Sequence, residues 1–151
     1  MDHAETYLKD LQHALAVLDL DQIKKARQAL SAARAEGKQI FVCGNGGSAS
    51  TASHLATDLG KGASQASAEA FKVMSLTDNI AWITALANDM SYEHVFVEQL
   101  RNFAQKGDVL LAISASGNSP NVIKAVEFAK ESGLTTLGWT GFDGGRLALL
   151  V

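Results

Sequence analysis

The feature that most constrains the fold is a short aliphatic run, Val109–Ile113, which leads directly into a serine-rich turn. A run of this length without polar residues is typical of a strand that is buried on both faces, as in a parallel sheet. Pro120 follows the turn, and proline is favourable at the first position of a helix. We therefore predict a strand, a turn and a helix in succession, with Ser119 as the N-cap of the helix.

The alternation of strands and helices continues along most of the chain, which indicates an α/β fold with a parallel sheet. We predict strands over 39–43, 71–76, 109–113 and 135–139. We predict helices over 4–18, from a cap at Asp21 to Gly37, over 48–59, from a cap at Thr77–Asp78 to Asn88–Asp89, over 92–105 and from Ser119 to Ser132, with surface loops over 60–70 and 140–145 and either a helix or a strand over 146–151.

Two amphipathic helices precede the first strand, and a small sheet cannot bury both of their apolar faces. We therefore predict that residues 1–36 form an N-terminal helical hairpin that serves as an oligomerisation element. Residues 37–151 are predicted to form the main domain.

Composition excludes several classes of protein. The chain has 151 residues, of which 47% are hydrophobic, and this fits one globular domain. A net charge of -3 argues against a nucleic-acid partner, and no apolar run approaches the roughly 20 residues that span a membrane. Cys43 is the one cysteine; we expect it to lie buried in a strand, without a disulfide, as suits the reducing cytoplasm.

Two turns rich in glycine and serine follow predicted strands, and they are the candidate binding site. One is Gly44-Asn45-Gly46-Gly47-Ser48 and the other is Ser114-Ala115-Ser116-Gly117-Asn118-Ser119. In a parallel sheet both turns open at the carboxyl edge, where ligands bind, and a helix N-terminus there favours an anion. The glycine turn lacks the lysine of a Walker A motif and the dinucleotide spacing. We therefore predict a small phosphorylated ligand and no nucleotide.

His54 and Asp58 are the candidate reactive side chains. They are four residues apart on a predicted helix, so they share one face of it. Such a pair can bind a divalent metal or act as an acid and a base. An ordinary surface contact is the alternative interpretation, and the position of the pair after a phosphate-type turn favours a function.

Together with Leu137-Gly138-Trp139-Thr140-Gly141, Ser75–Asp78 and Ala87–Asp89, these motifs resemble the sugar isomerase (SIS) domain family, and within it the phosphoheptose isomerase group, over residues 38–148. The resemblance implies a doubly wound, three-layer α-β-α sandwich preceded by N-terminal helices. It also implies aldose–ketose isomerisation of a sugar phosphate, most suitably sedoheptulose 7-phosphate to D-glycero-D-manno-heptose 7-phosphate. Enzymes of this group are cytoplasmic homotetramers with sites between subunits.

The resemblance further implies roles for individual residues. His54 would bind zinc, one ion per site, and Asp58 would bind zinc and act as the base, although the group usually has glutamate there. The remaining implied positions bind substrate: Ser48, Ser114, Ala115, Ser116 and Ser119 the phosphate, Asn45, Gly46 and Gly47 the sugar chain, and Asn88 and Asp89 its hydroxyls.

The group's other zinc ligands and second catalytic group, a glutamine and a histidine, come from a later helix. We therefore expect a SIS domain without its C-terminal part and an activity that depends on that part.

Two alternatives to the phosphoheptose isomerase stay open from the sequence. A non-catalytic SIS-domain protein is the second hypothesis, either a DiaA-like adaptor that regulates replication initiation or a sensor that binds a phosphosugar. The carboxylate at Asp58 argues against the adaptor. A different sugar phosphate is the third.

Overall fold

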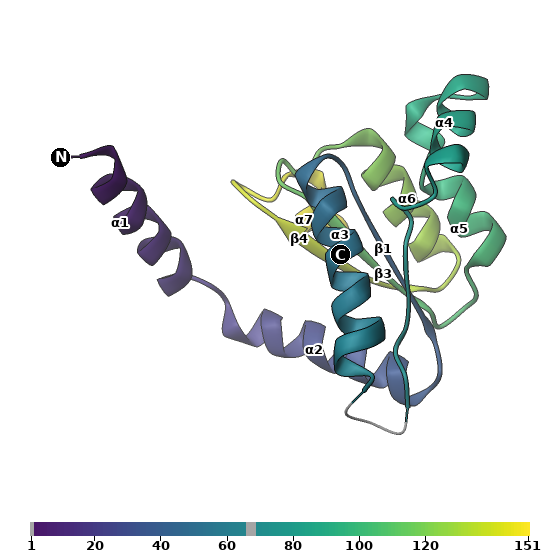
Figure 1. Ribbon diagram of the computed structural model, residues 1–151, viewed down its shortest axis with the longest axis horizontal. Coiled ribbons are helices and arrows are strands. Elements are labelled where there is room, and N and C mark those ends of the chain that lie inside the picture. The colour runs from purple at the N-terminus through teal and green to yellow at the C-terminus, as the bar shows by residue number, and fades with distance from the viewer. Residues whose placement is uncertain (1, 66–68) are drawn as a thin grey trace.

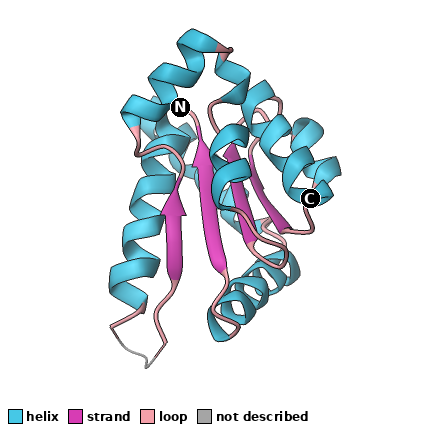
Figure 2. Ribbon diagram, turned by 90° about the vertical axis from the view of Figure 1, so that its right-hand side faces the viewer, coloured by secondary structure: helices cyan, strands magenta, loops and turns pink. Residues whose placement is uncertain are grey.

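The computed structural model describes residues 2–65 and 69–151 as a four-stranded parallel sheet between two layers of helices (Figure 1, Figure 2). The strand order is β2-β1-β3-β4, which confirms the predicted parallel α/β sandwich. The strands are β1 Gln39–Gly44, β2 Lys72–Ser75, β3 Val109–Ser114 and β4 Thr135–Thr140.

The helices also follow the predicted order, with differences at their ends. They are α1 His3–Ala16, α2 Leu20–Ala35, α3 Gly47–Thr57, α4 Ile80–Asp89, α5 Val97–Phe103, α6 Pro120–Glu131 and α7 Gly145–Leu150, with a π-helical turn η1 over Asp58–Ala63 and a 3-10 turn η2 over Tyr92–His94. The helix predicted over 92–105 is therefore two segments, η2 and α5. The predicted loop over 60–70 begins as part of η1, and its residues 66–68 lie outside the described residues.

Each face of the sheet has its own hydrophobic core, because side chains alternate along the strands. Phe41 and Leu110 face α5, α6 and α7, and they pack in one cluster with Leu100, Val126 and Leu147. On the other face the strand residues pack against α2 and α3, in a cluster of Ala33, Ile40, Val42, Ala52, Val109, Leu111 and Ile113. All of β3 is buried, as its aliphatic sequence predicts.

Helix α1 lies away from the rest of the chain (Figure 1). All of its residues are exposed, including Tyr7, Leu8, Leu11 and Leu15. The oligomerisation role of residues 1–36 stays a prediction, and the uncovered apolar stripe is compatible with it. In the parts of the chain that the structure describes, no helix combines the length and hydropathy needed to cross a bilayer.

Two of the predicted helix caps are wrong. Asp19, and not Asp21, caps α2: its Oδ1 accepts from the backbone N–H of Asp21 at 2.9 Å, while the Asp21 side chain pairs with Lys24. Asn79 caps α4 by accepting from the N–H of Trp82 at 3.0 Å. In both cases the cap is the residue directly before the first helical one, which is where a side-chain oxygen reaches the free N–H groups.

Candidate functional site

The serine loop, residues 114–119, joins the end of β3 to the start of α6. Ser114 is buried, and its Oγ lies 3.2 Å from the Oγ of Ser119. Ser119 occupies the predicted N-cap position, but its side chain makes no bond to the N–H groups of the helix. Its hydroxyl therefore turns toward Ser114, and the dipole at the start of α6 is available to an anion.

The segment after β4 forms backbone hydrogen bonds with the serine loop. The N–H of Gly141 donates to the Ala115 carbonyl at 2.9 Å, and the N–H of Leu147 donates to the Gly117 carbonyl at 2.9 Å. Gly117 has a φ of +64°, and a Cβ there would lie 1.9 Å from the carbonyl oxygen of Gly144. The loop is therefore a preformed element that accepts only glycine at its centre.

Gly44 brings the glycine turn beside the serine loop. It pairs with Ile113 in the sheet, and a Cβ at Gly44 would lie 2.7 Å from the Cβ of Ser48 and 2.8 Å from the carbonyl oxygen of Ile113. The missing side chain lets the first turn of α3 pack against the ends of β1 and β3. The structure thus places Ser48 next to the strand that leads into the serine loop, as the sequence predicts.

Asn45 connects the glycine turn to the first turn of α6, directly after the serine loop, through a reciprocal amide pair. Its Nδ2 donates to the Oδ1 of Asn121 at 2.8 Å, and the Nδ2 of Asn121 donates to the Oδ1 of Asn45 at 2.9 Å. The hydroxyl of Tyr92 also donates to the Oδ1 of Asn45, at 3.1 Å. The sequence does not predict Asn121 or Tyr92 as site residues, because their partner is distant along the chain.

The other predicted substrate-binding residues lie at the ends of their elements. Gly46 is the N-cap residue of α3, with a φ of +55°, Gly47 is its first residue, and both are exposed. Asn88 and Asp89 end α4 and bond to each other at 2.8 Å. Within the described residues no hydrogen bond joins Asn88 or Asp89 to either turn; η2, which follows them, contacts Asn45 through Tyr92.

His54 of α3 and Asp58, the first residue of η1, lie on one face of the continuing helix, as their spacing predicts. The Nε2 of His54 lies 3.3 Å from the Oδ2 of Asp58, and their side chains are 79% and 64% exposed. At 1.5 Å per residue, they lie about 10 Å and about 16 Å along the helix from Gly47. The chain therefore brings the two reactive groups together, about two to three helical turns beyond the glycine turn.

The same pair offers two side chains of the kinds that bind zinc. Imidazole nitrogen and carboxylate oxygen both suit zinc, which takes at least three protein ligands in most sites. Among the residues that the structure describes, three or more histidine, cysteine, aspartate or glutamate side chains nowhere gather as they would around a metal. His54 and Asp58 fit zinc as two of its ligands, and further ligands have to come from elsewhere.

Cys43 takes no part in this chemistry. It is buried in β1, and burial raises the pKa of its thiol to about 12. The thiol therefore stays protonated at neutral pH, when the thiolate is the nucleophilic form. The expectation of a buried strand residue is confirmed.

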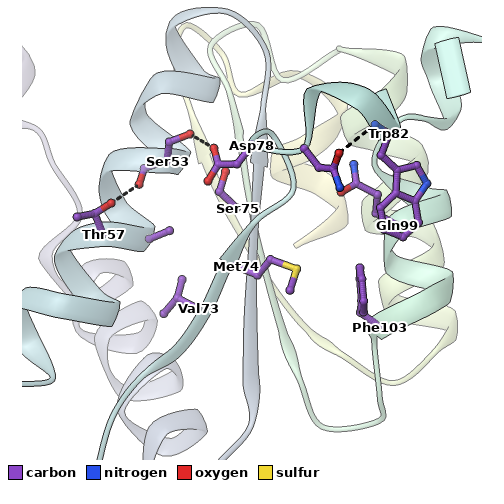
Figure 3. Close-up of a pocket in the computed structure, with 11 residues that line it drawn as sticks. Ser53, Thr57, Val73, Met74, Ser75, Asp78, Trp82, Gln99 and Phe103 are labelled. Atoms are coloured by element: carbon purple, nitrogen blue, oxygen red, sulfur yellow. Dashed lines mark hydrogen bonds between the residues drawn. The ribbon is translucent and has the colours of Figure 1, made fainter. Parts of the chain in front are cut away.

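A groove of about 630 Å³ lies beside the edge strand β2 (Figure 3). Residues of α3, β2, α4 and α5 line it, among them Ser53, Met74, Asp78 and Trp82. None of the predicted site residues contributes to it. The predicted site is thus separate from this groove.

The parallel sheet with adjoining glycine and serine turns places the protein among α/β domains that bind ligands at the carboxyl edge of the sheet. Residues 5–141 match the model of the SIS domain family, and the chain belongs to this family. Relatives within the family include phosphoheptose isomerases. The enzyme from Desulfovibrio desulfuricans is 45% identical over 121 residues, which cover 80% of this chain and 57% of the relative.

Other relatives extend the likeness. A probable phosphoheptose isomerase of Thermoplasma acidophilum is 39% identical over 95% of this chain and 79% of its own length. The solved structure of the phosphoheptose isomerase GmhA from Neisseria gonorrhoeae matches with a TM-score of 0.86 and 34% identity, over 99% of this chain and 77% of that one. The chain spans less than two thirds of the Desulfovibrio desulfuricans relative, 57% of its length.

Proposed function

We propose that the protein is an aldose–ketose isomerase that converts sedoheptulose 7-phosphate to D-glycero-D-manno-heptose 7-phosphate. The observation that carries the proposal is the preformed serine loop, which lies beside the glycine turn and keeps the N-terminus of α6 open to an anion. The relatives named above are all phosphoheptose isomerases. They favour an enzyme over an adaptor of the DiaA kind.

The serine loop would bind the phosphate of the substrate. The hydroxyls of Ser114, Ser116 and Ser119, with Ser48 and the positive end of the α6 dipole, would attract the phosphate without a fixed positive side chain. Such a site binds a phosphate group and still releases the product. The glycine turn would then face the sugar chain, with Asn88 and Asp89 near its hydroxyls.

Asp58 would act as the base. It would take a proton from the carbon beside the carbonyl and return it to the neighbouring carbon by way of an enediol. A base must come within about 2.6–3.2 Å of that proton, directly or through a water. Since aspartate is one methylene shorter than glutamate, the substrate would have to approach α3 more closely than in relatives with glutamate.

His54 would serve either as a zinc ligand or as the acid that donates a proton at the substrate oxygens. As a ligand, it would bind one zinc ion together with Asp58 and ligands from elsewhere. When bound, zinc supplies Lewis acidity that polarises the carbonyl.

The length of helix between the glycine turn and the exposed His54–Asp58 pair supports a site shared between copies. The pair is exposed and lies about 10–16 Å along α3 from the glycine turn, so it can face the serine loop of a neighbouring subunit. The uncovered apolar stripe of α1 supplies a surface for assembly. We therefore propose a homotetramer, and a cytoplasmic one, since the free, buried Cys43 suits a reducing compartment.

Incubation of the full-length protein with sedoheptulose 7-phosphate, with and without zinc, tests the proposal when the products are identified by chromatography. We expect heptose 7-phosphate, with a higher rate in zinc. A parallel incubation with fructose 6-phosphate measures the preference for a seven-carbon chain. Binding of sedoheptulose 7-phosphate without turnover in either condition would contradict the isomerase and favour the adaptor.

A further inference from the structure

The carboxamide of Asn45 is the most constrained polar group of the glycine turn. It exchanges two hydrogen bonds with Asn121, of 2.8 Å and 2.9 Å, and accepts a third from Tyr92 at 3.1 Å. Asn121 is buried, with 2% of its surface exposed. These partners come from η2 and from the first turn of α6, so two separate elements hold one side chain at the edge of the sheet.

A backbone N–H determines which groups donate and which accept in the hydrogen bonds among Asn45, Asn121 and Tyr92. The N–H of Val122 donates to the Oδ1 of Asn121 at 3.0 Å, and a backbone N–H can only donate. The oxygen of Asn121 must therefore face Val122 and the Nδ2 of Asn45. It follows that the Oδ1 of Asn45 faces the two donors, the Nδ2 of Asn121 and the hydroxyl of Tyr92.

Counting donors and acceptors leaves one group of Asn45 for a ligand. A primary amide has two acceptor positions on its oxygen and two N–H donors. Asn121 and Tyr92 occupy both acceptor positions, and Asn121 receives one of the N–H donors. Among the described residues the second N–H has no partner, so Asn45 can offer a ligand only a donor.

We propose that Asn121 and Tyr92 are positioning residues, which hold Asn45 so that its free N–H donates to an oxygen of the bound sugar phosphate. The inference rests on the proposed function for the identity of the ligand. A donor that is fixed before the ligand arrives costs no reorganisation during the reaction. It also selects a carbonyl or hydroxyl oxygen, which accepts, over an ammonium group, which cannot.

The elements that carry the two positioning residues are tied to each other independently of Asn45. In η2 the Nδ1 of His94 lies 2.9 Å from the Oγ of Ser91, and its Nε2 lies 3.1 Å from the Nζ of Lys124 on α6. Tyr92 itself is 55% exposed. Loss of its hydroxyl alone therefore leaves η2 attached to α6, so a Tyr92→Phe variant should fold normally.

The test uses Tyr92→Phe and Asn121→Ala, which both leave the charge of the site unchanged, in the full chain, with Tyr7→Phe on α1 as the matched control. Calorimetry measures the dissociation constants for sedoheptulose 7-phosphate and, separately, for inorganic phosphate. We expect each site variant to weaken sugar-phosphate binding by about threefold to tenfold, the effect of one hydrogen bond. Binding of inorganic phosphate should stay at the wild-type value, as should both constants in Tyr7→Phe.

Two further measurements separate positioning from a general structural role. In an Asn45→Ala background, Tyr92→Phe should have no additional effect on sugar-phosphate binding, because the group that it positions is gone. The side-chain amide of Asn45, followed by nitrogen-15 NMR without any ligand, should shift and exchange faster in both site variants. The amide signal reports the network even if the protein turns out not to be an isomerase.

The inference is overturned if the Asn45 amide signal is the same in wild type and in both variants. It is also overturned if Tyr92→Phe weakens sugar-phosphate binding equally with and without Asn45, or if inorganic phosphate loses affinity to the same degree. A wild-type protein that binds sedoheptulose 7-phosphate without converting it would instead contradict the proposed function alone.

Discussion

The serine loop and the His54–Asp58 pair differ in how the chain supports them. The loop lies on the buried strand β3, is bonded to the segment after β4, and has no space for a Cβ at Gly117. The pair lies where α3 passes into η1, with side chains 79% and 64% exposed. One chain thus builds a rigid serine loop, whereas its reactive pair is open to solvent, and in the proposed homotetramer a neighbouring subunit would cover it.

Loss of the Asp58 carboxylate should have the largest effect on activity. We expect Asp58→Asn to lower kcat by about 10²–10⁴-fold, the usual contribution of a general base. Binding of inorganic phosphate should stay unchanged, since the serine loop lies elsewhere. Steady-state kinetics and calorimetry check the two parts, and an active variant would remove Asp58 from the role of base.

A mixed assembly tests whether the two regions of the site come from different copies. Ser116→Asp places a carboxylate where the phosphate would bind, so this variant should be inactive. Co-expressed Asp58→Asn and Ser116→Asp chains should regain activity that neither has alone, because one subunit then supplies an intact loop and its neighbour an intact pair. No recovery in a confirmed mixed oligomer would place both regions in one subunit's site.

Gly117 tests the rigidity of the serine loop. Gly117→Ala forces a side chain into left-handed backbone and against the carbonyl of Gly144, so we expect a loss of about 2–4 kcal/mol in the free energy of unfolding. Gly46→Ala is the matched control: its φ is also positive, at +55°, but nothing lies within 4 Å of the added Cβ. It should lose only about 1–2 kcal/mol. Equal losses in the free energy of unfolding, measured with urea, would show that the serine loop changes conformation to accommodate the added Cβ and is not rigid.

Ser116 tests the loop as a phosphate site. Its Oγ accepts from the N–H of Asn118 at 3.2 Å, which leaves its O–H free to donate. We expect Ser116→Ala to weaken binding of inorganic phosphate by about tenfold, as for a hydrogen bond to a charged group. Ser31→Ala, at an exposed position of α2, is the control in the same titration, and unaltered affinity in both variants would argue against the phosphate assignment.

The smallest effect should come from the contact between His54 and Asp58. Exposed ion pairs add little to stability because water screens them and the side chains lose freedom. His54→Gln should therefore move the unfolding temperature by less than about 2 °C. A larger drop in differential scanning calorimetry would mean that the pair is already part of a buried assembly.

The sequence predicts the elements with strong patterns and misses contacts between distant residues. Val109–Ile113 predicts β3 because a short aliphatic run between turn residues is typical of a strand buried on both faces. The cap of α2 is harder to predict, since Asp19 and Asp21 have the same chemistry, and only the backbone geometry distinguishes them. The spacing of His54 and Asp58 predicts their contact but not how exposed the pair is.

The amide pair of Asn45 and Asn121 could not be predicted, because the two residues are far apart in the sequence. Asn45 directly follows β1, and Asn121 lies in the first turn of α6, after β3 and the serine loop. The pairing of Gly44 with Ile113 places the ends of β1 and β3 side by side, so the two amides can meet. A single sequence has no period or motif for such a pair. The same holds for Tyr92, whose place depends on the short 3-10 turn η2 in a region predicted as one helix.

The hydrogen bonds from Gly141 and Leu147 to the serine loop have a kinetic consequence. Because the serine loop has its binding conformation before a ligand arrives, association needs no slow rearrangement of the loop. The association rate of a sugar phosphate should therefore depend on diffusion and orientation. Ligands that share the phosphate group should then arrive at similar speeds. Discrimination among them would appear in residence time, which the polar groups around the sugar determine.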